Sequence, residues 1–96
     1  MKVTYTANED ILTVAIEGRL DTTTAPDLEQ QLKDKLTDDS VVVFDFEKLQ
    51  YISSAGLRVL LQCKKKLGDN VTFTRANEEV MEILSVTGFK ELLGLK

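Results

Sequence analysis

Residues Val41-Val42-Val43-Phe44-Asp45-Phe46 combine β-branched and aromatic side chains at both odd and even positions. Successive side chains of a strand point to opposite faces, so this run predicts a strand that is apolar on both sides. Strands of this kind belong in the interior of a sheet, commonly beside a parallel neighbour. Residues 41–46 are therefore predicted to form an interior strand.

An amphipathic helix is predicted before this strand. Its apolar residues recur at helical spacing and form a narrow stripe: Ala25, Leu28, Leu32 and Leu36. Thr24 is placed to cap the helix, and Pro26 falls in the first turn, where its missing N–H is harmless. Asp27 suits the positive end of the helix dipole. The segment predicts a helix that lies on the sheet.

The N-terminal residues predict a β-hairpin. Residues 2–7 alternate between polar and apolar side chains, Asn8-Glu9-Asp10 is a polar turn, and residues 11–17 are again rich in β-formers. Gly18 is predicted to end the second strand.

A second helix is predicted to begin at Ser53-Ser54-Ala55-Gly56 and to end near Leu67, before Gly68. Its apolar side chains cover a wide arc: Leu57, Val59, Leu60, Leu61, Cys63 and Leu67. Contact with both the sheet and a neighbouring helix explains this arc, and an exposed partner surface is the alternative.

The remaining residues predict a strand over 71–75 and a helix that Asn77 caps and Gly88 closes. The apolar residues of that helix are Val80, Ile83, Leu84 and Val86, and residues 89–93 form a last apolar turn or short helix. The element order is β-β-α-β-α-β-α. We expect an α/β fold in which residues 1–96 form a single domain with a mixed β-sheet, right-handed crossovers and helices packed on one face.

Composition narrows the classes of function. The net charge of -4 argues against a nucleic-acid partner, because such proteins usually carry a concentrated basic face. The basic cluster at residues 64–66 is either a solvated helix end or a binding patch. No signal peptide or membrane span is visible, and the lone Cys63 fits a reducing compartment, so we expect a cytoplasmic protein with no membrane partner.

The chain contains no histidine, which removes the commonest general base and the commonest neutral metal ligand. Any Ser-His-Asp or Cys-His mechanism is impossible within the chain. No acidic run has the spacing of a calcium loop. We therefore expect neither a catalytic site nor a metal site, and no cofactor is predicted.

Functional residues are expected in the loops at residues 19–24 and 53–56, because partners of α/β proteins tend to meet the loops beyond the carboxyl ends of strands. Ser54 lies at or beside the N-cap of the second helix. It is either an ordinary cap or a site of phosphorylation, since a helix N-terminus stabilises a phosphate. Asp21 is either a turn and capping residue or a functional acid, and Arg58 is either solvated or able to reach a phosphate on Ser54.

Three segments resemble the STAS domain family, specifically the bacterial anti-sigma factor antagonists, also called anti-anti-sigma factors. They are Tyr51-Ile52-Ser53-Ser54-Ala55-Gly56-Leu57, Gly18-Arg19-Leu20-Asp21-Thr22-Thr23-Thr24-Ala25, and Val86-Thr87-Gly88-Phe89. They span nearly the whole chain. The family register places the phosphorylatable serine at Ser54, with Ser53 where many members have aspartate and Ala55 where they have serine or threonine. Ser53 is thus a possible decoy acceptor.

The resemblance implies a STAS-like fold and a phosphorylation switch. The unphosphorylated protein would bind an anti-sigma factor that is also a serine kinase and free the sigma factor. Phosphorylation of Ser54 would abolish binding, and a metal-dependent serine phosphatase would restore it. The residues implied in partner binding are Asp21, Thr22, Thr23, Ser53, Ser54, Gly56 and Arg58.

Two alternatives to this switch are considered. STAS domains also occur as interaction modules of scaffold and transport complexes, where Ser54 would only be a cap. An enzyme with Ser54 as nucleophile is disfavoured, because no base is available and Lys64 is too far along the helix.

Overall fold

In the computed structural model, which describes residues 1–94, the predicted interior strand is β3 (Val41–Asp45). It pairs in parallel with β2 (Ile11–Leu20) on one side and with β5 (Val71–Thr74) on the other. Val42 and Phe44 are fully buried under the helices. The interior position and the parallel neighbours are thus confirmed.

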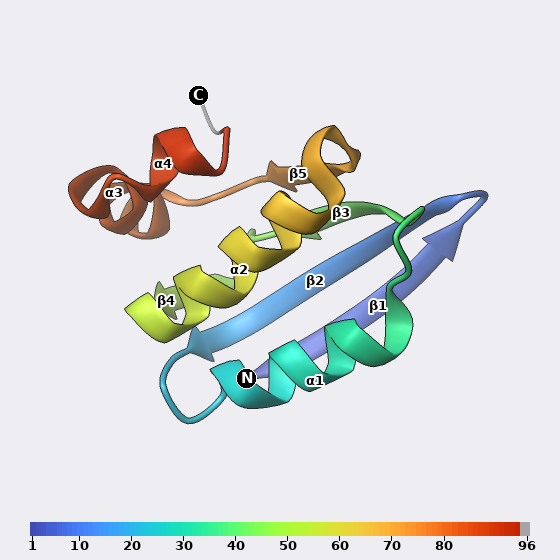
Figure 1. Ribbon diagram of the computed structural model, residues 1–96. Coiled ribbons are helices and arrows are strands. Elements are labelled where there is room, and N and C mark those ends of the chain that lie inside the picture. Colours follow the sequence, from blue (N-terminus) through green and yellow to red (C-terminus); the bar gives the residue numbers. More distant parts are fainter. Residues whose placement is uncertain (95–96) are drawn as a thin grey trace.

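The opposite face of β3 is only half-buried, although its sequence is equally apolar. Val41 and Val43 lie on this face. It carries no helix among the described residues, so only one side of the sheet forms the core (Figure 1).

The N-terminal hairpin is confirmed, but its second strand is longer than predicted. β1 (Lys2–Asn8) pairs antiparallel with β2. Gly18 does not end β2, because it adopts a φ of +87° and lies at a register shift between Gly18 and Arg19. A glycine tolerates this backbone conformation, so the strand bends and continues to Leu20.

One strand was missed by the sequence analysis. β4 (Leu49–Ile52) pairs in parallel with the end of β2, and Ile52 is opposite Leu20. The two parts of β2 thus pair with different strands, β3 first and β4 beyond the shift at Gly18. The element order is β-β-α-β-β-α-β-α-α instead of β-β-α-β-α-β-α. A run of four residues is too short to show a clear period.

Two long helices cover the same face of the sheet (Figure 1). They are α1 (Ala25–Lys35) and α2 (Ser54–Leu67), and they contact each other along their lengths. Leu60 of α2 is buried over the sheet, whereas Val59 and Cys63 face α1. The wide apolar arc of α2 is therefore explained by two neighbours, as expected.

The C-terminal part consists of a 3₁₀ turn (Gly68–Asn70), α3 (Glu78–Thr87) and α4 (Phe89–Leu92). The Asn77 side chain accepts a hydrogen bond from the Val80 N–H at 2.9 Å, which confirms the predicted cap. Gly88 closes α3 with a φ of +80°. Of the apolar residues of α3, Val80 and Leu84 are buried, whereas the side chain of Val86 is 80% exposed.

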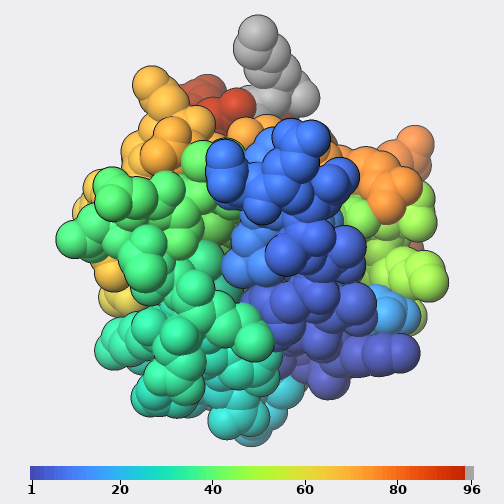
Figure 2. Space-filling view, turned by 90° about the vertical axis from the view of Figure 1, so that its right-hand side faces the viewer, coloured from blue at the N-terminus to red at the C-terminus, as the bar shows by residue number. Residues whose placement is uncertain are grey.

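The face turned toward the viewer in Figure 2 is built by the N-terminal strands and α1. The Tyr5 hydroxyl of β1 donates a hydrogen bond to Gln31 Oε1 of α1 at 2.6 Å, which ties the edge strand to the helix. Within residues 1–94, no helix has the length and apolar character needed to cross a membrane.

The basic cluster at the end of α2 is partly used within the molecule. Lys64 donates to the Val71 carbonyl at 3.2 Å, and Lys66 lies 3.6 Å from an Asp38 carboxylate oxygen. These contacts favour the helix-end interpretation over a binding patch.

Candidate functional site

The two loops singled out by the sequence lie at the same edge of the sheet. β2 and β4 are parallel neighbours, so the loops that follow them leave in the same direction. The Ser53 N–H donates a hydrogen bond to the Leu20 carbonyl at 2.8 Å. This bond joins the start of the Asp21 loop to the start of α2.

Gly56 allows α2 to approach this junction closely. A Cβ atom at position 56 would lie 2.6 Å from Leu20 Cγ and 3.1 Å from the Leu20 carbonyl oxygen. Leu20 is completely buried, so its side chain has little room to move away. Gly56 is itself buried, so its part in the site is to let α2 pack closely against Leu20.

The two serines at the start of α2 have different environments. Ser53 is the N-cap residue, and its hydroxyl accepts a hydrogen bond from the Gly56 N–H at 3.3 Å. Ser54 is the first residue of the helix and is exposed. Its hydroxyl has no hydrogen-bond partner in the described part of the chain. The capping role thus falls to Ser53, and Ser54 is left free beside the unpaired N–H groups of the first turn.

Asp21 organises the neighbouring loop. Its Oδ1 atom accepts hydrogen bonds from the Thr23 N–H at 3.0 Å, from the Thr23 hydroxyl at 2.7 Å and from the Thr24 N–H at 3.1 Å. Thr24 occupies the predicted N-cap position of α1, but its hydroxyl accepts from the Asp21 N–H at 2.8 Å and makes no cap bond to the helix. The Asp21 carboxylate therefore has the turn-forming role, and its role in partner binding stays a prediction.

The hydrogen bonds around Asp21, above all that from the Thr23 hydroxyl, hold the pKa of its carboxyl below the ordinary value. Asp21→Asn is expected to lower the melting temperature at neutral pH. Because the folded-state pKa is depressed, the stabilisation is present above the unfolded-state pKa and is lost as the pH falls through the folded-state pKa. The melting curves of the two proteins, followed by circular dichroism, should therefore converge in acid.

The exposed Asp39 provides a matched control for this experiment. Asp39→Asn should have the same melting temperature as the wild type at every pH. A melting difference for Asp21→Asn that stays constant into acid would contradict the assignment.

Arg19 begins the first predicted loop, but no role was predicted for it from the sequence. Its guanidinium lies 4.3 Å from the ring centre of Tyr51, and its Nε atom is 3.9 Å from an Asp21 carboxylate oxygen. A cation over an aromatic ring gains electrostatic energy. The family-like segment contains Arg19, but only the pairing of β2 with β4 brings it to Tyr51.

The other predicted partner-binding residues are at the surface. Thr22 and Thr23 are exposed in the loop before α1. Arg58 is exposed in α2 and has no ion pair with a residue in the range 1–94. The structure therefore leaves Arg58 free to contact either a partner or a phosphate on Ser54.

Ser54 lines a groove of about 690 Å³. The far wall of this groove was not predicted from the sequence. β4 and the start of α2 form one side, and α3 forms the other. The residues contributed by α3 are Glu79, Glu82, Ile83, Val86 and Thr87. No local motif marks them, because only the packing of α3 against β4 brings them to Ser54.

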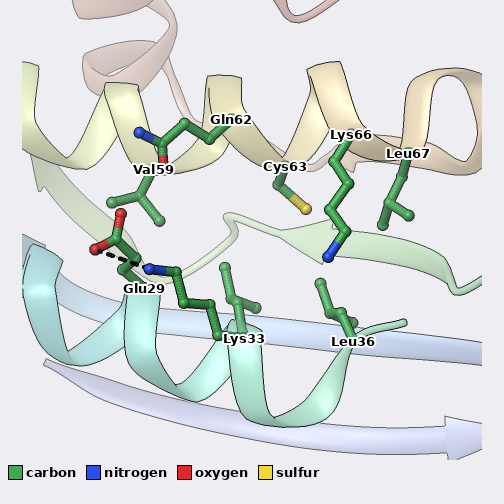
Figure 3. Close-up of a pocket in the computed structure, with 9 residues that line it drawn as sticks. Glu29, Lys33, Leu36, Val59, Gln62, Cys63, Lys66 and Leu67 are labelled. Carbon is green, nitrogen blue, oxygen red and sulfur yellow. Dashed lines mark ion pairs between the residues drawn. The ribbon is translucent and has the colours of Figure 1, made fainter. Parts of the chain in front are cut away.

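A second, smaller hollow of about 130 Å³ lies between α1 and α2 (Figure 3). Apolar side chains from both helices form its walls, and Glu29 and Lys33 lie at 3.9 Å from each other beside it. Cys63 points into the hollow and is a free cysteine.

The Cys63 thiol is expected to be unreactive in the folded protein. Burial raises its pKa to about 11, although the charge of Lys66 acts in the opposite direction. Its thiolate fraction at neutral pH is then about a hundred times lower than that of an ordinary cysteine. Alkylation by iodoacetamide, followed by mass spectrometry, should be at least about a hundredfold slower in the native protein than in urea. Equal rates would show that the thiol is accessible and ionised.

The sequence profile of the STAS domain matches residues 2–96. BtrV of Bordetella bronchiseptica, whose name marks it as a candidate anti-sigma factor antagonist, is 31% identical over 93 residues, which cover 93% of this chain and 80% of BtrV. The anti-sigma-F factor antagonist RsfB of Mycobacterium tuberculosis is 28% identical over 72 residues, which cover 74% of this chain and 59% of RsfB.

Solved structures share the fold at lower identity. The anti-sigma factor antagonist SpoIIAA in its unphosphorylated form is 14% identical, with a TM-score of 0.77 over 95% of this chain and 84% of that chain. The phosphorylated form of SpoIIAA from Bacillus is 13% identical, with a TM-score of 0.69 over 95% of this chain and 87% of that chain. A sulfate transporter family protein from Wolinella succinogenes is 15% identical, with a TM-score of 0.74 over 93% of this chain and 75% of that chain. A profile match over nearly the whole length, together with a relative of 31% identity, shows that the chain belongs to the STAS domain family.

Proposed function

We propose that this protein is an anti-sigma factor antagonist whose binding is controlled by phosphorylation of Ser54. The observation that carries the proposal is the exposed, unpaired Ser54 hydroxyl at the first position of α2, beside the Asp21 loop. The names of BtrV and RsfB support the antagonist role, and the two recorded forms of SpoIIAA support control by phosphorylation.

The switch acts at an interface rather than through the fold. A phosphoserine carries a charge of about -1.5 to -2 at neutral pH, and the N-terminus of a helix stabilises such a charge. Phosphorylation therefore leaves α2 folded. A partner surface that accepts a neutral hydroxyl loses affinity when it meets a bulky dianion, and a loss of about 3 kcal/mol weakens binding more than a hundredfold.

In the proposed cycle, the unphosphorylated protein binds an anti-sigma factor and the sigma factor is released. The anti-sigma factor is also the serine kinase, so it modifies Ser54 within the complex and the complex dissociates. A metal-dependent serine phosphatase restores the binding form. The protein itself acts in the cytoplasm without catalysing a reaction.

Ser54, rather than Ser53, is the proposed acceptor. The Ser53 hydroxyl is engaged with the Gly56 N–H, and its residue is half-buried, whereas Ser54 is exposed. Phosphorylation of Ser53 would sacrifice the N-cap of α2, which typically contributes about 1 kcal/mol.

Phosphosite mapping tests this proposal. After incubation with its kinase and ATP, the protein should carry one phosphate, and peptide mass spectrometry should place it on Ser54. Ser54→Ala should remain unmodified, whereas Ser53→Ala should still be phosphorylated. A phosphate on Ser53 in the wild type would overturn the assignment of the acceptor.

A second candidate function is a STAS interaction module without a phosphorylation cycle. The sulfate transporter family protein of the same fold favours this possibility. In that case the purified kinase would leave the chain unmodified, and Ser54→Asp would not change partner binding.

A further inference from the structure

The far wall of the Ser54 groove is a single stripe of α3. Its members are spaced i, i+3, i+4 and i+7 along the helix: Glu79, Glu82, Ile83 and Val86. Residues at these spacings share one face of a helix. Val80 and Leu84, on another face of α3, are fully buried and hold the helix in the core. The fold thus fixes the stripe in place and presents it to the groove.

The C-terminal end of the stripe is apolar and exposed. Val86 is 80% exposed, more than any other large apolar side chain within residues 1–94, and Ile83 beside it is half-buried. Leu57 of α2 also lines the groove. A single exposed valine is common at protein surfaces. A group of apolar side chains in a groove beside a candidate modification site is instead typical of a surface that contacts a partner.

The N-terminal end of the stripe is acidic. Glu79 and Glu82 are exposed, and no lysine or arginine in the described chain forms an ion pair with either of them. Arg19, the one cation among the described residues that line the groove, is already in contact with Asp21 and Tyr51. This wall therefore offers negative charge that no ion pair within residues 1–94 neutralises.

Contacts at its N-terminus fix the position of α3 beside β4. The Asn77 side chain donates to the Leu49 carbonyl at 2.7 Å, which anchors the start of α3 at the start of β4. Glu79 also borders a shallow hollow with Gln50. Ser54 comes after the end of β4, so Glu79, beside Gln50, lies nearer to the start of that strand.

We infer that this stripe of α3 is a second docking surface for the anti-sigma factor, an inference that rests on the proposed function. The complementary partner surface carries an apolar side chain that packs on Ile83 and Val86. It also carries lysine or arginine residues that face Glu79 and Glu82. Opposite charges across an interface raise the association rate and fix the register of the partner.

The α3 surface adds to the affinity of the unphosphorylated protein, whereas a phosphate on Ser54 acts through the bulk and charge that it places against the partner. The Ser54 end controls whether the complex forms, and the α3 end contributes affinity and specificity.

Charge reversal tests the surface. The probe is the purified anti-sigma factor that phosphorylates the chain, held with a non-hydrolysable ATP analogue so that Ser54 stays unmodified. Glu79→Lys/Glu82→Lys should bind roughly tenfold or more weakly than the wild type. Raising the salt concentration should weaken wild-type binding and change the variant little. Val86→Ser, which changes no charge, should also weaken binding.

The matched control is Asp34→Lys/Asp39→Lys. It makes the same change in net charge at two exposed positions on and after α1, which lies on the other side of α2 from α3 (Figure 1). This control should bind as tightly as the wild type. Circular dichroism should give the same folded spectrum for all variants, because each substituted side chain is exposed.

Ser54→Asp separates the failure of this inference from the failure of the proposed function. If Glu79→Lys/Glu82→Lys binds like the wild type while Ser54→Asp does not bind, the α3 surface is not part of the interface and the switch stands. If Ser54→Asp binds like the wild type, the proposed function fails, and the inference fails with it. Tighter binding by the charge-reversed variant, or a wild-type dimer that this variant disrupts, would also overturn the inference.

Discussion

Ser54→Asp is expected to weaken binding to the anti-sigma factor at least about a hundredfold and to leave the fold intact. Ser54 is exposed at the first helical position, where an acidic side chain interacts favourably with the helix dipole. The loss therefore arises at the interface, where a charge must be desolvated against a surface that fits a neutral hydroxyl. Isothermal titration calorimetry measures the affinity, and circular dichroism checks the fold.

Ser54→Ala is the matched control. It removes the acceptor hydroxyl but adds no charge, and no hydrogen bond within residues 1–94 depends on that hydroxyl. It should bind the kinase nearly as tightly as the unphosphorylated wild type and remain bound in the presence of ATP. Wild-type affinity in Ser54→Asp would show that charge at this position does not control binding.

Gly56→Val is expected to lower the free energy of unfolding by about 3 kcal/mol. Its Cβ atom would lie 2.6 Å from Cγ of the fully buried Leu20, and close to the carbonyl that holds Ser53. Relief of this overlap requires α2 to move away from β2, which separates the two loops of the site. Urea denaturation followed by circular dichroism measures the change.

Two further variants isolate the steric cause. Gln62→Val places the same β-branched residue at an exposed position of α2 and should cost less than about 1 kcal/mol. Leu20→Ala is destabilising by itself, but it removes the atoms nearest to the added Cβ. The combination of Gly56→Val with Leu20→Ala should therefore be less destabilising than the sum of the single changes, and strict additivity would refute the overlap.

The elements with strong local signals were predicted correctly from the sequence. These signals involve residues that are close together in the sequence, so they can be recognised without knowing the fold. They include the cap at Asn77, the end of α3 at Gly88 and the helical spacing of Leu28 and Leu32. The strand β4 was missed because its four residues are stabilised by pairing with the distant end of β2. The continuation of β2 beyond Gly18 was missed for the same reason, because its last residues are paired with β4.

The candidate site was predicted in part for the same reason. The helix start at Ser54 can be argued from the sequence, but the two loops are brought together by the pairing of β2 with the missed strand β4. The wall contributed by α3 depends on the packing of a helix far along the chain, and this packing leaves Val86 exposed beside the groove. The division of roles between Ser53 and Ser54 depends on which hydroxyl faces the Gly56 N–H, which spacing alone does not decide.

The most direct test of the proposed switch is sigma factor release. Fluorescently labelled sigma factor is bound to the purified anti-sigma factor, and its anisotropy is followed while this protein is added. The unphosphorylated protein should lower the anisotropy to that of free sigma factor, and the protein phosphorylated on Ser54 should leave it unchanged at the same concentrations. Equal release by both forms, or release by neither form, would contradict the proposed switch.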